Sequence, residues 1–279
     1  MRTRLMQRGQ IEVAATEVPL ASRPAAEVPG HWLLARLGKR VLRPGGLRLT
    51  RSLLGDARIA GQHVVEFAPG MGRTATVVLD HGPIDYIGVD ADPHAAELIN
   101  RLVSPKGRAI AAQAAASGLP DHSADVVLAE GVLTIQSETG KQQIVDEGVR
   151  LLRPGGRYVL HELALRDDDD GADAAAIRAE LAQAMHVHAR PKTVAQWQSL
   201  LTDAGLRVQT VHTSPLALLE PRRVLADEGF VGALRFARNV LADKPARRRV
   251  RAMAKTLRAH KSALQAVGVV AVKAVGPPA

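Results

Sequence analysis

The chain has 279 residues, and 46% of them are hydrophobic, which is enough apolar material for a buried core. It has no cysteine, so disulfides, thiolate metal sites, iron–sulfur clusters and cysteine nucleophiles are excluded. No apolar run approaches the roughly 18 residues that cross a bilayer, and residues 1–30 lack the apolar stretch of a signal peptide. We therefore expect a cytoplasmic protein.

The formal net charge of +9 is unevenly distributed. Residues 1–51 carry ten basic and three acidic side chains, and residues 52–243 carry 18 basic and 25 acidic ones. Residues 244–279 carry nine basic side chains and no acidic ones. An acidic centre between basic flanks differs from a uniformly basic nucleic-acid-binding protein. Since aromatic residues for base stacking are also few, we do not expect a nucleic-acid partner.

Short apolar runs alternate with helical segments along most of the chain. Residues 1–30 are predicted to be a flexible leader, and helices are predicted over 31–42 and 47–59. Strands are then predicted over 64–67, 86–90, 108–114, 125–129 and 157–163, with helices over 73–80, 93–103 and 141–152 between them. This alternation predicts an α/β fold with a parallel sheet covered on both faces.

The C-terminal part is mostly helical. Helices are predicted over 174–187 and 194–204, a sixth strand over 207–212, a largely helical stretch over 220–265 and a last strand over 269–275. The helices therefore form a preamble before the first strand and insertions after the fifth and sixth strands.

The turn after the first strand, residues 66–72, is the strongest candidate ligand site. Its glycines let the backbone approach a ligand closely, and the following helix N-terminus favours a carboxylate or phosphate. Residues 70–75 also fit the G-x-G-x-x-G/A dinucleotide pattern, and Asp90 follows Gly70 by twenty residues. Asp90 could accept both hydroxyls of an adenosine ribose. A nicotinamide-dependent oxidoreductase is therefore one interpretation.

Four ordered segments, 64–72, 88–93, 119–127 and 151–157, resemble class I S-adenosylmethionine-dependent methyltransferases that modify small molecules. The resemblance implies a doubly wound, Rossmann-like, seven-stranded and mostly parallel sheet with a reversed last strand. It also implies one methyltransferase domain over residues 31–279. Its parts would be N-terminal helices (31–60), a cofactor-binding core (61–165), acceptor and lid helices around strand six (166–265) and the last strand (266–276).

The same resemblance implies S-adenosylmethionine as the cofactor and assigns residue roles. Glu66 is expected to face the methionine ammonium and Asp90 the ribose hydroxyls, while Glu130 would lie near the methionine part or the acceptor. The other predicted cofactor contacts are Ala68, Pro69, Gly70, Gly72, Ala91, Asp92, Gln113 and Ala114.

Two positions depart from the pattern of that family. Ala68 replaces the first glycine of the turn, a small change that should be tolerated. The loop after the third strand has Gln113 or Ala115, depending on register, where the family usually has an acidic residue near the adenine. We favour Gln113 for that place.

His161, at the end of the fifth strand, and Glu130 are the candidate catalytic residues. Methyl transfer from a sulfonium depends largely on proximity and orientation, and it needs a base only when the acceptor must lose a proton. An imidazole with a pKa near ~6.5 suits that task. The other interpretation of His161 is a histidine hydrogen-bonded inside the sheet edge.

Three further features are assigned no chemistry. His186 and His188 have no acidic or cysteine ligands around them, so no metal is predicted, and surface histidines are favoured over substrate contacts. The four aspartates at 167–170 lack the spacing of a calcium loop and predict a solvated loop. The basic amphipathic stretch 244–261 is interpreted as a solvated face, ahead of contact with nucleic acid or anionic lipid.

We therefore expect an enzyme that methylates an oxygen or carbon of a small phenolic, quinone-like or other secondary-metabolite acceptor and releases S-adenosylhomocysteine. Helices in 31–59 and 174–265 would close over the acceptor. The alternatives are an NAD(P)-dependent oxidoreductase and a cofactor-binding protein without turnover. Weak contact with a membrane surface and a homo-oligomer stay open.

Overall fold

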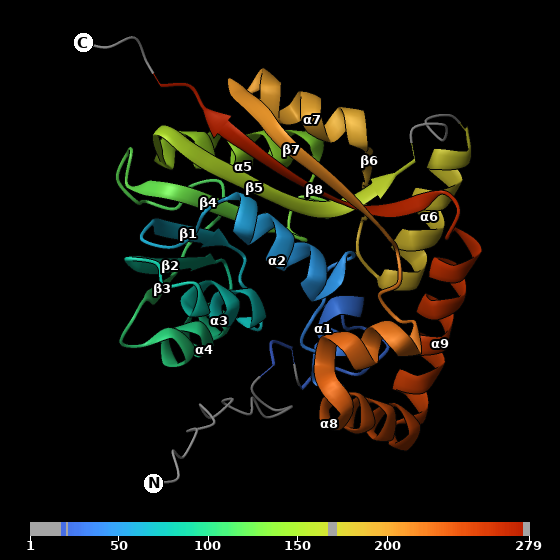
Figure 1. Cartoon of the computed structure of the whole chain (residues 1–279). Coiled ribbons are helices and arrows are strands. Elements are labelled where there is room, and N and C mark those ends of the chain that lie inside the picture. Colours follow the sequence, from blue (N-terminus) through green and yellow to red (C-terminus); the bar gives the residue numbers. More distant parts are fainter. Residues whose placement is uncertain (1–17, 21, 167–171, 276–279) are drawn as a thin grey trace, which may run out of the picture.

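The computed structural model describes residues 18–20, 22–166 and 172–275 (Figure 1). The predicted loop of four aspartates, 167–170, lies outside the described residues. The described part of the predicted leader is packed against the domain: Val18 and Val28 are buried, and Arg249 donates hydrogen bonds to the carbonyls of Ala25 and Val28.

One sheet runs through the described residues in the order β3-β2-β1-β4-β5-β8-β7, and the two-residue β6 pairs with β5 off this path. The strands are β1 (His63–Phe67), β2 (Asp85–Asp90), β3 (Arg108–Ala111), β4 (Ala124–Glu130), β5 (Leu152–Leu165), β6 (Lys192–Thr193), β7 (Leu206–Pro215) and β8 (Leu264–Lys273). β1 to β5 pair in parallel, whereas β8 is antiparallel to both β5 and β7. The predicted α/β fold with a mostly parallel sheet and a reversed last strand is confirmed.

Helices cover both faces of this sheet (Figure 1). One apolar core joins the sheet to α2 (Gly46–Asp56), α3 (Arg73–Asp80) and α4 (Pro93–Val103). A second core joins the other face to α5 (Glu138–Leu151) and α7 (Val194–Asp203). Because both faces are buried, the central strands carry continuous apolar runs rather than alternating ones.

The remaining helices form a third apolar cluster beyond the ends of the strands. They are α1 (Gly30–Arg36), α6 (Ala172–Met185), α8 (Pro221–Ala242) and α9 (Lys244–Ala259). In Figure 1 these helices lie together on the side of the molecule away from β3. Segments before the first strand and after the fifth strand are thereby brought side by side.

The largest differences from the predicted boundaries are in the first helix, the fifth strand and the last strand. The fifth strand begins at Leu152, five residues before the predicted start. The first helix ends at Arg36 rather than near residue 42, because Gly38 takes a φ of 101° and the Glu228 carboxylate accepts the backbone N–H groups of Arg40 and Val41. The last strand begins at Leu264, five residues before the predicted start, and shortens the predicted helical stretch that was to reach residue 265.

The part of β8 that precedes the predicted start includes Gly268. A Cβ at this position would meet the Leu53 side chain of α2 at 2.7 Å, so the glycine lets the helix pack closely on the strand. Glycine inside a strand commonly marks such a close approach, although in the sequence it resembled a strand boundary.

Candidate active site

A cavity of about 1080 Å³ lies at the carboxyl ends of β1, β2 and β4. The strand order reverses here, because β1 has β2 on one side and β4 on the other. Ligands of open α/β sheets bind at such a switch point. The cavity is lined by Glu66, Ala68, Pro69, Gly70, Asp90, Ala91, Asp92, Gln113, Ala114 and Glu130. Of the predicted site residues, only Gly72 and His161 do not line it.

The turn between β1 and α3 borders the cavity with left-handed backbone. Ala68, Gly70 and Gly72 have φ values of 52°, 55° and 69°. A Cβ at Gly70 would have only the Ala68 carbonyl oxygen nearby, at 3.9 Å, so this position is open. A Cβ at Gly72 would overlap Leu102 and Ile99 of α4. Gly72 therefore serves packing, whereas Gly70 leaves space for a ligand.

Two carboxyl groups face the cavity and have no ion-pair partner among the residues that the structure describes. Glu66, the next-to-last residue of β1, accepts a hydrogen bond of 2.7 Å from the Tyr86 hydroxyl, and burial raises its pKa to about 8. Asp90 ends β2 and accepts the backbone N–H groups of Gly70 (3.2 Å) and Asp92 (3.0 Å), while burial raises its pKa as well. Because burial disfavours their charged forms, this end of the cavity is suited to a cation or to hydroxyl donors.

Glu130, at the end of β4, has the opposite environment. It accepts hydrogen bonds from Thr50 (2.8 Å) and Thr74 (2.5 Å) and forms an ion pair of 3.5 Å with Arg43. Burial alone would raise the pKa of Glu130, but the charge of Arg43 and the hydrogen bonds from His161 and Thr74 outweigh it and lower the pKa to about 2. Glu130 is therefore a fixed carboxylate that joins the N-terminal segment to the turn after β1.

His161 is fully buried and has both ring nitrogens engaged. Nδ1 lies 2.9 Å from a Glu130 oxygen, and Nε2 accepts the backbone N–H of Gly45 at 3.1 Å. Since Nε2 is the acceptor, the ring proton lies on Nδ1 and is donated to Glu130. The imidazole has no lone pair directed into the cavity. This geometry favours the interpretation of His161 as a hydrogen-bonded histidine of the sheet edge.

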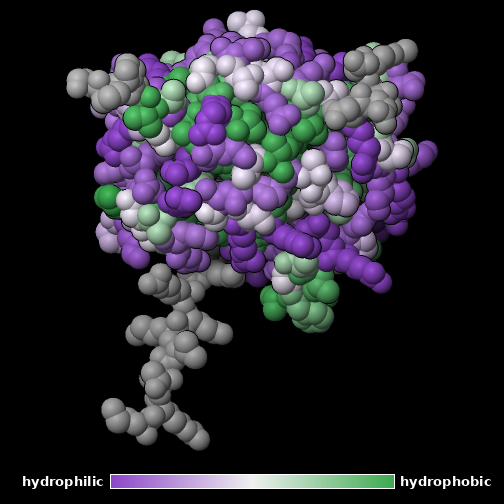
Figure 2. All heavy atoms as spheres, turned by 45° about the horizontal axis from the view of Figure 1, so that its top comes forward, coloured by the Kyte–Doolittle hydropathy of each residue, from purple (hydrophilic) through white to green (hydrophobic). Residues whose placement is uncertain are grey.

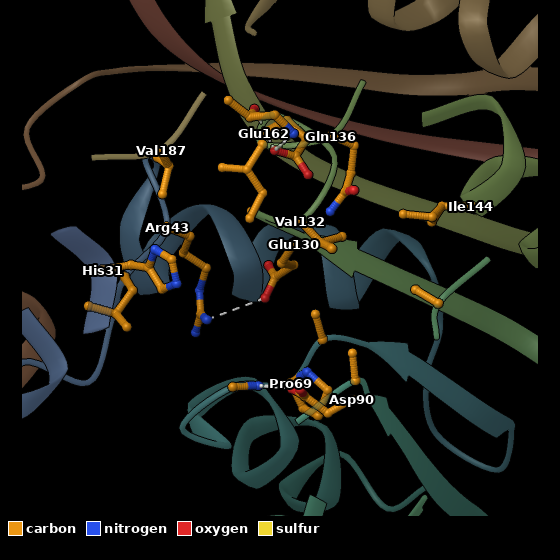
Figure 3. Close-up of a pocket in the computed structure, with 18 of the residues that line it drawn as sticks. His31, Arg43, Pro69, Asp90, Glu130, Val132, Gln136, Ile144, Glu162 and Val187 are labelled. Atoms are coloured by element: carbon orange, nitrogen blue, oxygen red, sulfur yellow. Dashed lines mark hydrogen bonds and ion pairs between the residues drawn. The ribbon is translucent and has the colours of Figure 1, made fainter. Parts of the chain in front are cut away.

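The far end of the cavity is mostly apolar and comes from the third cluster. Its lining includes Trp32, Leu42, Leu181, Met185, Leu218 and Leu257. Figure 3 shows Asp90 and Pro69 on one side, Val187 and Glu162 on the other, and Glu130 with Arg43 between them. His31 also lines this region, and burial lowers its pKa to about 4, so its ring is neutral near pH 7.

Sequence reasoning missed Arg43 and Glu162. Arg43 is 9% exposed, and its Nε and Nη2 atoms have no hydrogen-bond partner among the described residues. Glu162 accepts hydrogen bonds from Leu133 N–H and from Thr134, and burial raises its pKa to about 7. The sequence gives only weak signals for these two residues: a Pro-Gly-Gly turn follows Arg43, and Glu162 lies near the end of a predicted strand.

The predicted surface histidines lie outside the cavity. His186 and His188 are exposed, and only Val187 between them lines it. Among the residues that the structure describes, no group of three or more His, Asp or Glu side chains is placed to hold a metal ion. Within the same residues, every helix is too short or too polar to cross a membrane.

A family model described as a methyltransferase domain matches residues 65–160, which hold most of β1, all of β2 to β4, the turn after β1 and both carboxyl groups of the cavity's acidic end. The chain therefore contains a methyltransferase domain. The cofactor of this family is S-adenosylmethionine. The oxidoreductase interpretation of the glycine turn is therefore set aside.

Three proteins illustrate what this chain is similar to. An uncharacterized protein of Haemophilus influenzae is 30% identical over 223 residues, which are 78% of this chain and 87% of that protein. An O-methyltransferase of Pyrenophora dematioidea is 26% identical over 194 residues, 66% of this chain and 71% of that protein. The crystal structure of geranyl diphosphate C-methyltransferase from Streptomyces coelicolor, with Mg²⁺, geranyl diphosphate and S-adenosyl-L-homocysteine, has a TM-score of 0.60 and 14% identity, covering 81% of this chain and 78% of that one.

Proposed function

We propose that this methyltransferase transfers the methyl group of S-adenosylmethionine to an oxygen or carbon of a small, largely apolar acceptor, such as a phenolic or quinone-like ring. The observation that carries the proposal is the two-ended cavity, which has carboxyl groups at the strand ends and apolar side chains under the helices. Its volume of about 1080 Å³ exceeds the ~300–1,000 Å³ typical of a pocket for one small molecule. A cofactor and an acceptor can therefore occupy it together.

The acidic end fits the methionine and ribose parts of the cofactor. Glu66 would bind the ammonium group, which supplies the positive partner that its buried carboxylate lacks. Asp90 would accept the ribose hydroxyls, with Gly70 leaving room for the ligand beside the turn. Gln113 and Ala114 would border the adenine. When bound, S-adenosylmethionine supplies a methyl group that is already activated for transfer.

The polar groups at the middle of the cavity position the reactants. Arg43 keeps Glu130 ionised, so this carboxylate stabilises positive charge beside it but is too acidic to take a proton from a phenol. Where the acceptor must lose a proton, Glu162 is the better candidate, because it lines the cavity and its pKa of about 7 is near the working pH. His161 would hold the Glu130 carboxylate in place rather than act as the base.

The test has two parts that separate the alternatives. Isothermal titration with S-adenosylhomocysteine should show binding in the micromolar range, and no heat at several hundred micromolar would overturn the assignment of the acidic end. Turnover is then measured with methyl-labelled S-adenosylmethionine and a panel of phenols, quinols and anionic polar acceptors. Binding without product across the panel would favour a cofactor-binding protein without turnover. A cytoplasmic location and the oligomeric state stay predictions.

A further inference from the structure

The second part of α8 has an apolar face that no described segment covers. Gly229, with φ 72° and ψ 174°, interrupts the helix, and residues 230–242 follow as a separate straight segment. Phe230, Leu234 and Leu241 are 75%, 61% and 62% exposed and lie at i, i+4 and i+11, which places them on one face of the helix. Val231, beside them, is 68% exposed.

This exposure is not a consequence of poor packing of the helix. The opposite face of the same segment carries Phe236, which is 7% exposed and belongs to the third apolar cluster together with Val240. The segment therefore has an inner apolar face that is buried and an outer apolar stripe that is not. Large contiguous apolar patches on a folded surface commonly mark an interaction site.

The next helix, α9, presents a row of cations. Its basic, exposed residues recur at i, i+4, i+7, i+11 and i+14, so they share one helix face, whereas Val250 and Met253 are buried on another. These residues are Lys244, Arg248, Arg251, Lys255 and Arg258. None of the five has an ion-pair partner among the residues that the structure describes.

The helices that carry the apolar stripe and the cationic row are neighbours. Asp243 alone separates α8 from α9 along the chain, and the two helices contact each other. In Figure 2 a group of hydrophobic side chains projects at the lower edge, where α8 lies, with hydrophilic side chains beside it. Residues 229–261 contain ten basic side chains and one acidic side chain, Asp243, whose carboxylate caps α9 by accepting the Ala246 N–H.

We propose that the α8–α9 surface docks on an anionic lipid bilayer, with Phe230, Val231 and Leu234 entering the interface and the α9 cations facing the headgroups. The combination of apolar side chains and unpaired cations is what such an interface binds. A second copy of the chain would bring two cationic rows together, and a nucleic acid would leave the apolar stripe uncovered. The charge therefore argues against a second copy and the apolar stripe against a nucleic acid, so an anionic membrane fits this surface best.

Co-sedimentation of the full chain with vesicles tests the proposal. Vesicles of 70% phosphatidylcholine and 30% phosphatidylserine should bind the protein at 50 mM salt at least tenfold more tightly than pure phosphatidylcholine, and 500 mM salt should reverse this preference because it screens the charges. The double variants Phe230→Ser/Leu234→Ser and Arg248→Glu/Arg251→Glu should each weaken binding at least tenfold. All four side chains are exposed, so the melting temperature should not change.

The matched control variants are at the starts of β2 and β3, at the β3 end of the sheet. Ile84→Ser removes another exposed apolar side chain (62% exposed), and Lys106→Glu/Arg108→Glu reverses two exposed charges at the start of β3. Both should bind the anionic vesicles as the wild type does. Failure of the wild-type chain to bind these vesicles overturns the proposal, as does equal weakening by the control variants. Dissociation of a dimer by the α8 variant, without vesicle binding, would identify a self-association surface instead. None of these measurements depends on turnover.

Discussion

Replacing Glu66 with Gln should stabilise the ligand-free protein at alkaline pH while it weakens cofactor binding. In the folded protein burial raises the pKa of Glu66 to about 8, whereas the ordinary value, which applies to the unfolded chain, is near 4.5. Between these two values the folded state holds a proton that the unfolded state has lost. The free energy of unfolding therefore falls as pH rises from about 4.5 to 8, and Gln removes this dependence.

The size of the effect follows from the two pKa values. Each pKa unit corresponds to about 1.4 kcal/mol, so the ionised Glu66 costs at most about 5 kcal/mol above pH 8. Most of this cost develops between pH 5 and 9, where we expect the difference between Glu66→Gln and wild type to grow by about 4 kcal/mol. The Tyr86 hydroxyl can still donate to the Gln oxygen, so the buried hydrogen bond is retained.

Urea unfolding at pH 5, 7 and 9, without ligand, measures this difference directly. The matched control is Tyr86→Phe, which keeps the titrating carboxyl. Because the Tyr86 hydrogen bond lowers the pKa of Glu66, the stability of this variant should fall with rising pH at least as much as that of the wild type. Titration with S-adenosylhomocysteine at pH 7 should release about one proton in the wild type, because the ammonium requires the ionised carboxylate, and none in Glu66→Gln. Parallel stability profiles for wild type and Glu66→Gln would refute the reasoning.

Three other variants test separate parts of the site. His161→Ala should lower the free energy of unfolding by about 3 kcal/mol, because two buried hydrogen-bonding groups lose their partner, and should leave the shape of the pH–rate profile unchanged; loss of one limb of that profile would make His161 the base. Asp90→Asn should weaken binding of S-adenosylhomocysteine in calorimetry by about 10- to 100-fold, as expected for a charged hydrogen bond, whereas the exposed control Asp80→Asn should bind normally. Ala68→Gly should raise the free energy of unfolding in urea by up to about 1 kcal/mol, because Ala68 has a φ of 52°; a clear loss of stability would contradict this.

The acidic end of the cavity could be predicted from the sequence because its parts are local. α3 and α4 begin and end at the predicted residues, since Gly72 precedes the first and Asp92 with Pro93 starts the second by accepting the His94 N–H. Each of these helices follows a strand that carries a carboxyl at its last or next-to-last residue. Strand ends in a parallel sheet meet at one edge, so Glu66 and Asp90 come together without any long-range information.

The apolar end of the cavity could not be predicted in this way. Its walls come from α1, α6 and α9. α1 lies more than a hundred residues before the other two helices, and all three meet through nonspecific apolar packing. Arg43 could not be identified as a site residue for the same reason, because nothing near it in the sequence indicates that Glu130 will be its partner. The end of α1 depends likewise on Glu228, which accepts backbone N–H groups from a segment 187 and 188 residues away.

The network around Glu130 has a consequence for how this enzyme could change its substrate in evolution. Thr74 belongs to the shared, family-matched core, whereas Arg43 and Thr50 belong to the N-terminal segment outside it. A new acceptor-binding segment grafted onto this core would leave Glu130 buried without its cation unless it brought a basic residue to the same place. Exchange of the N-terminal segment is therefore constrained by a single carboxylate, and homologues that keep an acid at this position should keep a matching base in the segment before β1.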